Sequence, residues 1–304
     1  MPSLGDLEGR SYKRILALEA KHEREAARVL RDALNEMRAQ LTVIYEKYAS
    51  DGVLTLADMT RYHRLTTLEI DILKTLDPAT RATLRTINRL RPEQYGEAFF
   101  QYAWAIDQAS GVALKWGALN RPAIIASLDN RMYKIAADVY PRDARAQILR
   151  ALNSGLAQGK SYQDMARDLK HAINTTMFRA QRIIRTEGQT AQSAAQDAAY
   201  ARAEDQGVEM GVVWDATLDD VTRESHQAMD GQGRAADGFF DGPGGERAPY
   251  PAWEGLSAEE RIQCRCRLRA EIDGYAPSLR RTRESGIVPY QTYPAWKENH
   301  STWR

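Results

Sequence analysis

Residues 264–272 read CRCRLRAEI, and this run breaks most clearly with the helical pattern of the preceding chain. Its small and apolar residues alternate with charged ones, and successive side chains of an extended strand point to opposite faces. One face holds Cys264, Cys266, Leu268, Ala270 and Ile272. The run therefore predicts a strand that directs the only two cysteines of the chain to one side.

A second strand is expected at Val208–Trp214, where Val208, Met210, Val212 and Trp214 share one face. Gly207 precedes it and suits the left-handed end of a helix. Between the two strands, residues 238–245 read GFFDGPGG, which no regular element tolerates. Ser257-Ala-Glu-Glu260 has the pattern of a capping box and predicts a short helical turn.

Residues 1–207 are expected to be almost entirely helical. The first segment, about Leu7 to Tyr48, has apolar residues at steps of three and four, which is the stripe of an amphipathic helix. Its length is typical of a helical arm or a coiled-coil-like partner surface, although a long helix packed on its own domain fits equally well.

Further helix boundaries follow from capping residues, prolines and glycines. Helices are expected to start near Thr55–Asp58, Asp77-Pro78, Arg91-Pro92, Arg121-Pro122 and Gly159–Asp164, to end near Leu152–Gly155, and to run at about Thr175–Asp205. The sequence thus predicts an α+β fold. Its parts are a mainly helical body at 1–174 with a long first helix, a small α+β domain at 175–273, and an extended tail at 274–304.

The tail is rich in proline, arginine and aromatic residues, which is typical of a segment that docks on a partner or on its own chain. Its candidate docking residues are Tyr290, Tyr293, Trp296 and Trp303.

Composition excludes several classes of protein. The 304 residues include 42 basic and 41 acidic side chains, and a net charge of +1 does not suit a protein that coats nucleic acid over its whole surface. No apolar run reaches the length of a membrane span, and the N-terminus does not have the pattern of a secretory signal. We therefore expect an intracellular protein with reduced cysteines and no membrane partner.

The Cys-x-Cys pair is too close for an unstrained disulfide between its own members. The alternatives are two thiols buried in a small core, a metal site, or a bond to another chain. His226, Cys264 and Cys266 together offer one nitrogen and two sulfurs, a set that zinc accepts, and Asp219 or Asp220 could add a fourth ligand. The spacing matches no familiar zinc signature, which favours buried thiols. No cofactor is therefore certain, and zinc is the candidate.

Arg182-Ile-Ile-Arg185-Thr-Glu187, on the last long helix, predicts a buried Arg/Glu network that ties this helix to the C-terminal sheet. No nucleophile elbow, Walker loop or dinucleotide fingerprint is present, so no catalytic residue is predicted and the chain is not expected to be an enzyme. The alternative is a zinc-dependent hydrolase or transferase that uses Glu187 and His226.

An arginine face is expected along the strand at 264–272 and beyond it. Evenly spaced guanidinium groups suit phosphates or acidic protein surfaces, and the alternative is a solvated face of weak ion pairs. The candidate contact residues are Arg261, Arg265, Arg267, Arg269, Arg280, Arg281 and Arg283.

Taken together, these motifs resemble those of the tailed-phage minor head proteins, the Mu F-like head morphogenesis family. The similarity covers roughly residues 180–272, and the helical part resembles the family in character, including the run from Leu152 to Ser161. The matching residues are Arg185, Thr186, Glu187, Trp214, Asp220, Arg223, His226, Asp230, Gly231, Cys264, Arg265 and Cys266.

The resemblance implies a structural role in the virion. Family members are present in a few copies, associate with the portal protein at one vertex inside the capsid, and affect head assembly and DNA packaging or delivery. It also implies contact with packaged double-stranded DNA and with major capsid or scaffolding protein, and a stay in the host cytoplasm during assembly. A DNA-binding assembly factor that is not retained in the virion is a further alternative.

This chain departs from its relatives in two places. Many relatives have Cys-x-x-Cys where this chain has Arg223-x-x-His226, and a histidine where it has Arg261. These departures remove candidate metal ligands, although His226 could replace one lost cysteine. Some relatives carry toxin domains after the shared module, and the tail here is too short to be one.

Overall fold

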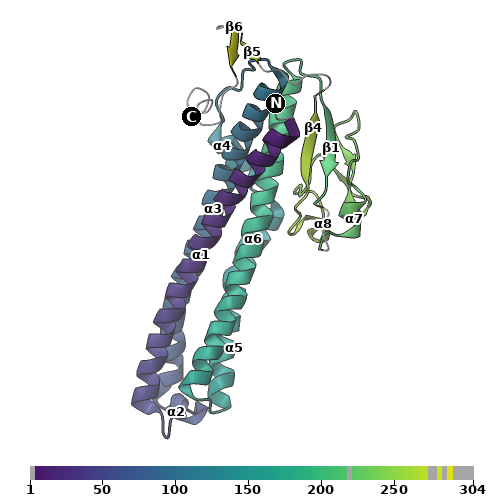
Figure 1. The fold of residues 1–304 in the computed structure, drawn as a ribbon. Coiled ribbons are helices and arrows are strands. Elements are labelled where there is room, and N and C mark those ends of the chain that lie inside the picture. The colour runs from purple at the N-terminus through teal and green to yellow at the C-terminus, as the bar shows by residue number, and fades with distance from the viewer. Residues whose placement is uncertain (1–3, 218–220, 273–278, 283–285, 290–304) are drawn as a thin grey trace. The chain divides into compact units, whose positions relative to one another are not determined.

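The computed structural model describes residues 4–217, 221–272, 279–282 and 286–289 (Figure 1). The chain forms two compact units. Unit 1 comprises Met1–Ala20, Arg89–Met132 and Arg185–Arg304, and unit 2 comprises Lys21–Asn88 and Tyr133–Ile184. Each unit combines segments that are distant in sequence. The domain boundaries expected from the sequence, at 174 and 273, stay predictions.

Helices dominate the described residues, and short strands follow them toward the C-terminal end, as Figure 1 shows. The expected α+β class with a long first helix is confirmed. The helices are α1 Leu4–Tyr48, α2 Leu56–Thr60, η1 Arg61–His63, α3 Arg64–Ser110, α4 Arg121–Leu128, α5 Arg131–Ala157, α6 Tyr162–Glu204, α7 Glu224–Gln227, η2 Pro243–Gly245 and α8 Ala258–Arg261. The strands are β1 Gly211–Asp215, β2 Phe240–Asp241, β3 Arg247–Ala248, β4 Arg267–Glu271, β5 Leu279–Thr282 and β6 Gly286–Pro289.

Unit 2 is helical and is built from amphipathic faces. The apolar stripe of α1 contributes Leu30, Met37 and Leu41 to its core, where all three are buried. Burial of such side chains stabilises each by about 1.5–3 kcal/mol relative to exposure, so tertiary packing sustains these long helices. The expected stripe of the first helix therefore packs on its own unit over this stretch.

Two predicted helix starts are wrong, because Pro78 and Pro92 lie inside α3 and do not begin new helices. A proline in a helix interior removes one hydrogen bond and costs about 3 kcal/mol. Buried side chains continue on either side of these sites, among them Leu76, Ala79 and Leu90. Their burial offsets the loss. The helix expected at 175–205 likewise starts earlier, since α6 is continuous from Tyr162.

Other predicted boundaries are confirmed. Thr55 caps α2 in a full capping box with Asp58, and the Ser161 hydroxyl accepts from the Asp164 N–H at 3.3 Å at the start of α6. Gly155 lies in the last turn of α5, where a Cβ atom would stand 1.9 Å from the Met165 sulfur. Only glycine permits this close approach of α5 to α6.

Unit 1 contains the small sheets. β1 and β4 pair antiparallel with Trp214 opposite Leu268, and β2 pairs with β3, and β5 with β6. The strand at 264–272 is shorter than expected, because β4 begins at Arg267. The alternation nevertheless holds, with Cys264, Cys266 and Leu268 buried in the core of this unit.

The helices that the structure describes include none that is long and apolar enough to span a membrane.

Candidate functional site

The motif residues between 214 and 266 come together in unit 1. The short helix α7 carries His226, and the Asp230-Gly231 turn that follows returns to β1. The Gly231 N–H donates to the Trp214 carbonyl at 2.8 Å, and the Ala216 N–H donates to the Asp230 carboxylate at 3.0 Å. The Arg223 guanidinium donates to the Ile262 carbonyl. These contacts hold the loop after β1 against the segment that leads into β4.

His226, Cys264 and Cys266 form the chemical centre of this region. All three are buried, and one ligand atom from each lies within 4.8 Å of those of the other two. The His226 Nδ1 atom is 3.3 Å from the Cys266 sulfur and 3.6 Å from the Cys264 sulfur. The Trp214 indole meets the His226 ring edge to face, with the centroids 6.4 Å apart.

Glu260 completes the surroundings of the imidazole. Its carboxylate lies 3.0 Å from His226 Nε2 and accepts a hydrogen bond from the Ser225 hydroxyl at 3.0 Å. Glu260 was expected only as part of a capping box. The Ser257 hydroxyl does accept from its N–H, so the short helix α8 aims the carboxylate at the histidine.

The two thiols differ in acidity. A hydrogen bond from Cys264 lowers the pKa of the Cys266 thiol, and His226 adds to the shift. The same contact, together with burial, raises the pKa of Cys264 well above its ordinary value. Cys266 is therefore the sulfur that first becomes a thiolate, and a thiolate is the form that acts as a nucleophile or a metal ligand.

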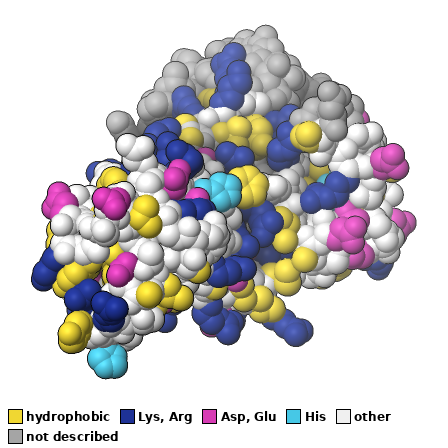
Figure 2. Space-filling model, turned by 90° about the horizontal axis from the view of Figure 1, so that it is seen from below, with side chains coloured by type: hydrophobic (Ala, Val, Ile, Leu, Met, Phe, Trp, Pro, Cys, Tyr) yellow, Lys and Arg dark blue, Asp and Glu magenta, His cyan; other side chains and the backbone are white. Residues whose placement is uncertain are grey.

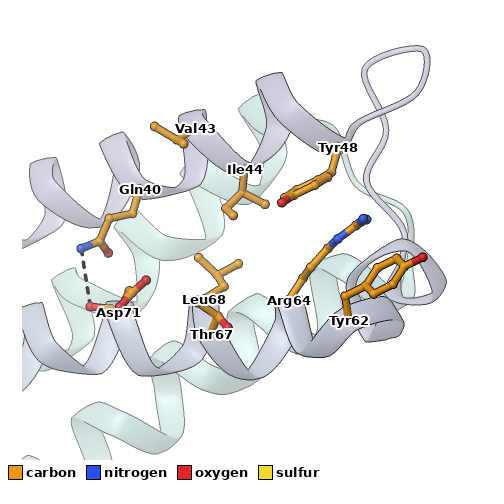
Figure 3. A pocket seen from close by; sticks show the side chains of 9 residues that line it. All are labelled: Gln40, Val43, Ile44, Tyr48, Tyr62, Arg64, Thr67, Leu68 and Asp71. Atoms are coloured by element: carbon orange, nitrogen blue, oxygen red, sulfur yellow. Dashed lines mark hydrogen bonds between the residues drawn. The ribbon is translucent and has the colours of Figure 1, made fainter.

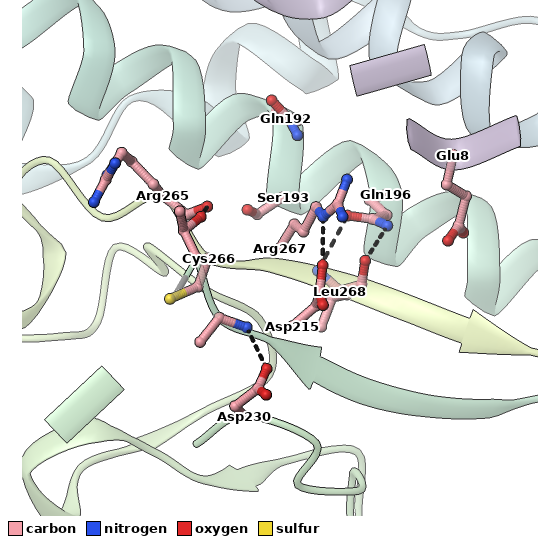
Figure 4. Close-up of polar contacts among 12 residues, drawn as sticks. Glu8, Gln192, Ser193, Gln196, Asp215, Asp230, Arg265, Cys266, Arg267 and Leu268 are labelled. Atoms are coloured by element: carbon pink, nitrogen blue, oxygen red, sulfur yellow. Dashed lines mark hydrogen bonds and ion pairs between the residues drawn. The ribbon is translucent and has the colours of Figure 1, made fainter. Parts of the chain in front are cut away.

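Helix α6 holds the other edge of β4 through buried amide side chains (Figure 4). The Gln196 Nε2 donates to the Leu268 carbonyl at 2.7 Å, and the Leu268 N–H donates back to the Gln196 amide oxygen at 3.3 Å. Gln189 donates to the Cys266 carbonyl at 2.7 Å. These amides satisfy backbone groups that a third strand would otherwise pair, so α6 fixes the position of Cys266.

Glu187 is the centre of a buried ion-pair network. Its Oε1 accepts from Arg261 at 2.7 Å, and its Oε2 lies 3.5 Å from Arg91 Nε and accepts from Asn130 at 3.3 Å. The second contact of Arg261 is the Thr190 hydroxyl, at 3.1 Å. The expected network is present, but its cations are Arg91 and Arg261. Both are far from Glu187 in sequence, so the local spacing of residues could not identify them.

Arg261 therefore corrects the prediction of an arginine face. Only 1% of this residue is exposed, and its charge is matched by Glu187, so it is not a surface contact for DNA. Arg267 is also committed, because its Nε lies 2.5 Å from the Asp215 carboxylate and its guanidinium covers the Tyr12 ring. Arg265 is exposed and donates to the Thr222 hydroxyl at 3.2 Å. Arg269 is half-buried.

Basic side chains do not gather into one stripe on the face shown in Figure 2, where they lie among acidic and apolar ones. This mixture agrees with the net charge of +1. Arg280 and Arg281 lie on β5, whose side chains are not described, and other predicted contacts lie outside the described residues: Asp219, Asp220, Arg283, Tyr290, Tyr293, Trp296 and Trp303.

The Arg-Thr-Glu motif divides its roles. Glu187 and Thr186 are buried, and the Thr186 hydroxyl accepts from the Gln263 N–H at 3.1 Å, whereas Arg185 is exposed. Two residues of this motif thus join α6 to the segment just before Cys264.

Glu8, near the start of α1, is a buried carboxyl that the sequence did not reveal. Burial raises its pKa to about 8, against the hydrogen bond from the Tyr200 hydroxyl and the attraction of Arg267, which lower it. Tyr200 lies edge to face with Tyr102, so the carboxyl is enclosed by aromatic side chains and is protonated at neutral pH.

The raised pKa of Glu8 predicts a pH-dependent stability. Between the ordinary value of 4.5 and about 8, the folded chain keeps a proton that the unfolded chain releases. The free energy of unfolding should therefore fall as pH rises through this range, by at most about 1.4 kcal/mol per pH unit, with the stabilisation fully present below 4.5. Glu8→Gln should remove this pH dependence. In urea unfolding from pH 5 to 8, the free energy of unfolding of the wild type should fall relative to that of the variant. Parallel curves would contradict the assignment.

Unit 2 has a pocket of about 530 Å³ between α1 and the start of α3 (Figure 3). The Arg64 guanidinium lies over the Tyr48 ring, 4.0 Å from its centroid, and Tyr62 stands at the rim with 84% of its surface exposed. The nine described residues that line it include one carboxylate, Asp71, and no histidine or cysteine. Such a lining suits binding through aromatic and guanidinium groups.

Comparison with known proteins matches the region of the site. The family model described as "Phage Mu protein F like protein" matches residues 146–269, which contain α6, β1, α7 and most of β4. Over these residues, the chain is similar to the phage Mu protein F-like family. The resemblance found in the sequence motifs is thereby confirmed.

The similarity to two known proteins extends well beyond the motif region. The minor head protein GP7 of Bacillus phage SPP1 is 27% identical, over 91% of this chain and 92% of GP7. The NAD(+)–arginine ADP-ribosyltransferase EFV of Enterococcus faecalis is also 27% identical, over 88% of this chain and 55% of that enzyme. No solved structure matches significantly.

Proposed function

We propose that this chain is a minor head protein of a tailed phage, a structural component that acts in head morphogenesis. The observation that carries this proposal is the similarity to GP7, which spans nearly the whole of both chains. The family module at residues 146–269 supports the same role. A head protein of this kind associates with the virion and contacts other capsid components.

At a finer level, we propose that it binds the portal protein at the inner side of one capsid vertex and assists DNA packaging or delivery. The long helix α1, the pocket of unit 2 and the aromatic tail offer partner surfaces, because aromatic and arginine side chains are frequent interface anchors. Arg261 and Arg267 form ion pairs with Glu187 and Asp215, so we propose the exposed Arg265 as the first of the predicted arginines to test for contact with DNA.

A pull-down against the portal protein of the same phage tests the finer proposal. Full-length protein should retain the portal, and a version truncated at Gly274 should lose it if the tail is the anchor. A mixture of full-length protein with an unrelated portal serves as the control. Failure of both versions across a range of salt would contradict direct portal binding and leave the broader head role to be judged by virion content.

The similarity to an ADP-ribosyltransferase raises the alternative of an enzyme, and we propose that this chain is not one. The match covers just over half of that enzyme, so the similarity does not by itself assign the enzyme's activity to this chain. Glu187 is the carboxylate that a catalytic role would require, and both of its oxygens are engaged, by the buried Arg91 and Arg261 and by Asn130. These contacts support a structural role for Glu187. Transfer of ADP-ribose from NAD to arginine by the purified chain would contradict the proposal that the chain is not an enzyme.

A further inference from the structure

We infer that His226, Cys264 and Cys266 together bind one zinc ion, which pins the loop after β1 to the segment before β4. Zinc prefers nitrogen and sulfur donors in a tetrahedral arrangement, with bonds of about 2.0 Å and 2.3 Å, which sets the donor atoms about 3.5 Å apart. The observed Nδ1 to sulfur separations are 3.3 and 3.6 Å. The imidazole nitrogen thus already stands at the distance from each sulfur that one shared ion requires, and all three donor atoms lie within 4.8 Å of one another.

The second nitrogen of the imidazole supports the same assignment. A histidine that binds a metal usually donates its other ring N–H to a carboxylate or carbonyl, which fixes the tautomer. Glu260 lies 3.0 Å from His226 Nε2, so a proton on Nε2 leaves the Nδ1 lone pair directed at both sulfurs. One lone pair accepts one well-directed hydrogen bond, whereas a single ion would engage all three donors at once.

Space and charge also fit. A cavity of about 20 Å³ borders the three side chains, and the Thr217 and Thr222 side chains line it as well. A space of about 10–15 Å³ holds one water, so the fourth position can be filled by a water molecule. Two cysteine thiolates balance the double positive charge of the ion. Both sulfurs are therefore needed to offset the desolvation penalty of burying it.

Metal analysis of the full-length protein tests this inference. Untagged protein, purified under reducing conditions and dialysed, should carry about one zinc ion per chain. Cys264→Ser/Cys266→Ser and His226→Ala should lose most of it, while His171→Ala, at an exposed position of α6, should retain it. Far-UV circular dichroism checks that each variant folds. Equal zinc in the wild type and the site variants would overturn the assignment.

Cobalt titration keeps the test decisive if a variant fails to fold, because it uses the wild-type chain. Co²⁺ at a tetrahedral site with two thiolates should give sulfur-to-metal charge-transfer bands and intense visible bands that zinc then removes. A folded, reduced wild type that shows neither bound zinc nor these bands would overturn the inference. The inference does not rest on the proposed head role, and neither result would alter that role.

Discussion

Glu187→Gln should lower the free energy of unfolding by about 3–5 kcal/mol, because it leaves buried guanidinium groups without their counter-charge. The Gln side chain has nearly the same shape, so the loss reports the charge and not a cavity. Arg91 and Arg261 are both buried beside this carboxylate. Urea unfolding of the full chain, followed by far-UV circular dichroism, measures the change.

Glu209→Gln is the matched control, since Glu209 is exposed in the same unit. A substitution at such a surface site usually changes stability by no more than about 0.5 kcal/mol. If Glu187→Gln were as mild as this control, the buried network would not be a structural support. A catalytic role for Glu187 would then have to be considered again.

Trp214→Ala should destabilise unit 1 by about 3–5 kcal/mol, the usual cost of removing a large aromatic side chain from a core. Trp214 is completely buried, pairs with Leu268 across the β1–β4 ladder, and packs edge to face on Phe240 at 5.3 Å between centroids. It also contacts His226, so its loss should loosen the cysteine and histidine cluster. Thermal unfolding followed by circular dichroism measures the effect.

Phe178→Ala provides the comparison, because Phe178 is 59% exposed on α6. Its truncation should leave stability nearly unchanged. Trp214→Phe should fall between the two, since a smaller ring keeps part of the packing. Similar melting curves for Trp214→Ala and Phe178→Ala would show that the Trp214 contacts do not stabilise the fold.

Local signals in the sequence predicted the parts of the fold that depend on neighbouring residues. The capping box at Thr55–Asp58, the left-handed Gly207 and the alternation of Cys264, Cys266 and Leu268 are each set by short spacings. Pro78 and Pro92 misled because a local rule predicted a helix start, whereas burial along α3 outweighs the cost of a proline.

The site was only partly accessible in the same way. The motif placed Glu187, His226 and the cysteines together, but the partners that define their chemistry are remote in sequence. Arg261 lies 74 positions from Glu187, and Glu260 lies 34 positions from His226. Such pairs depend on the packing of α8 against α6 and α7, which no periodicity encodes. Glu8 was missed for the same reason, since only the fold buries it.

If the chain is a structural component of the phage head, it must be present in purified virions, and its amount there is the quantity to measure. Particles banded in a density gradient and treated with protease should contain a few intact copies of the chain per particle. Mass spectrometry against labelled standards measures this number. Co-purification with the heads after protease treatment would place it within the particle. Intact, infectious virions that lack the chain, while infected cells contain it, would contradict the account.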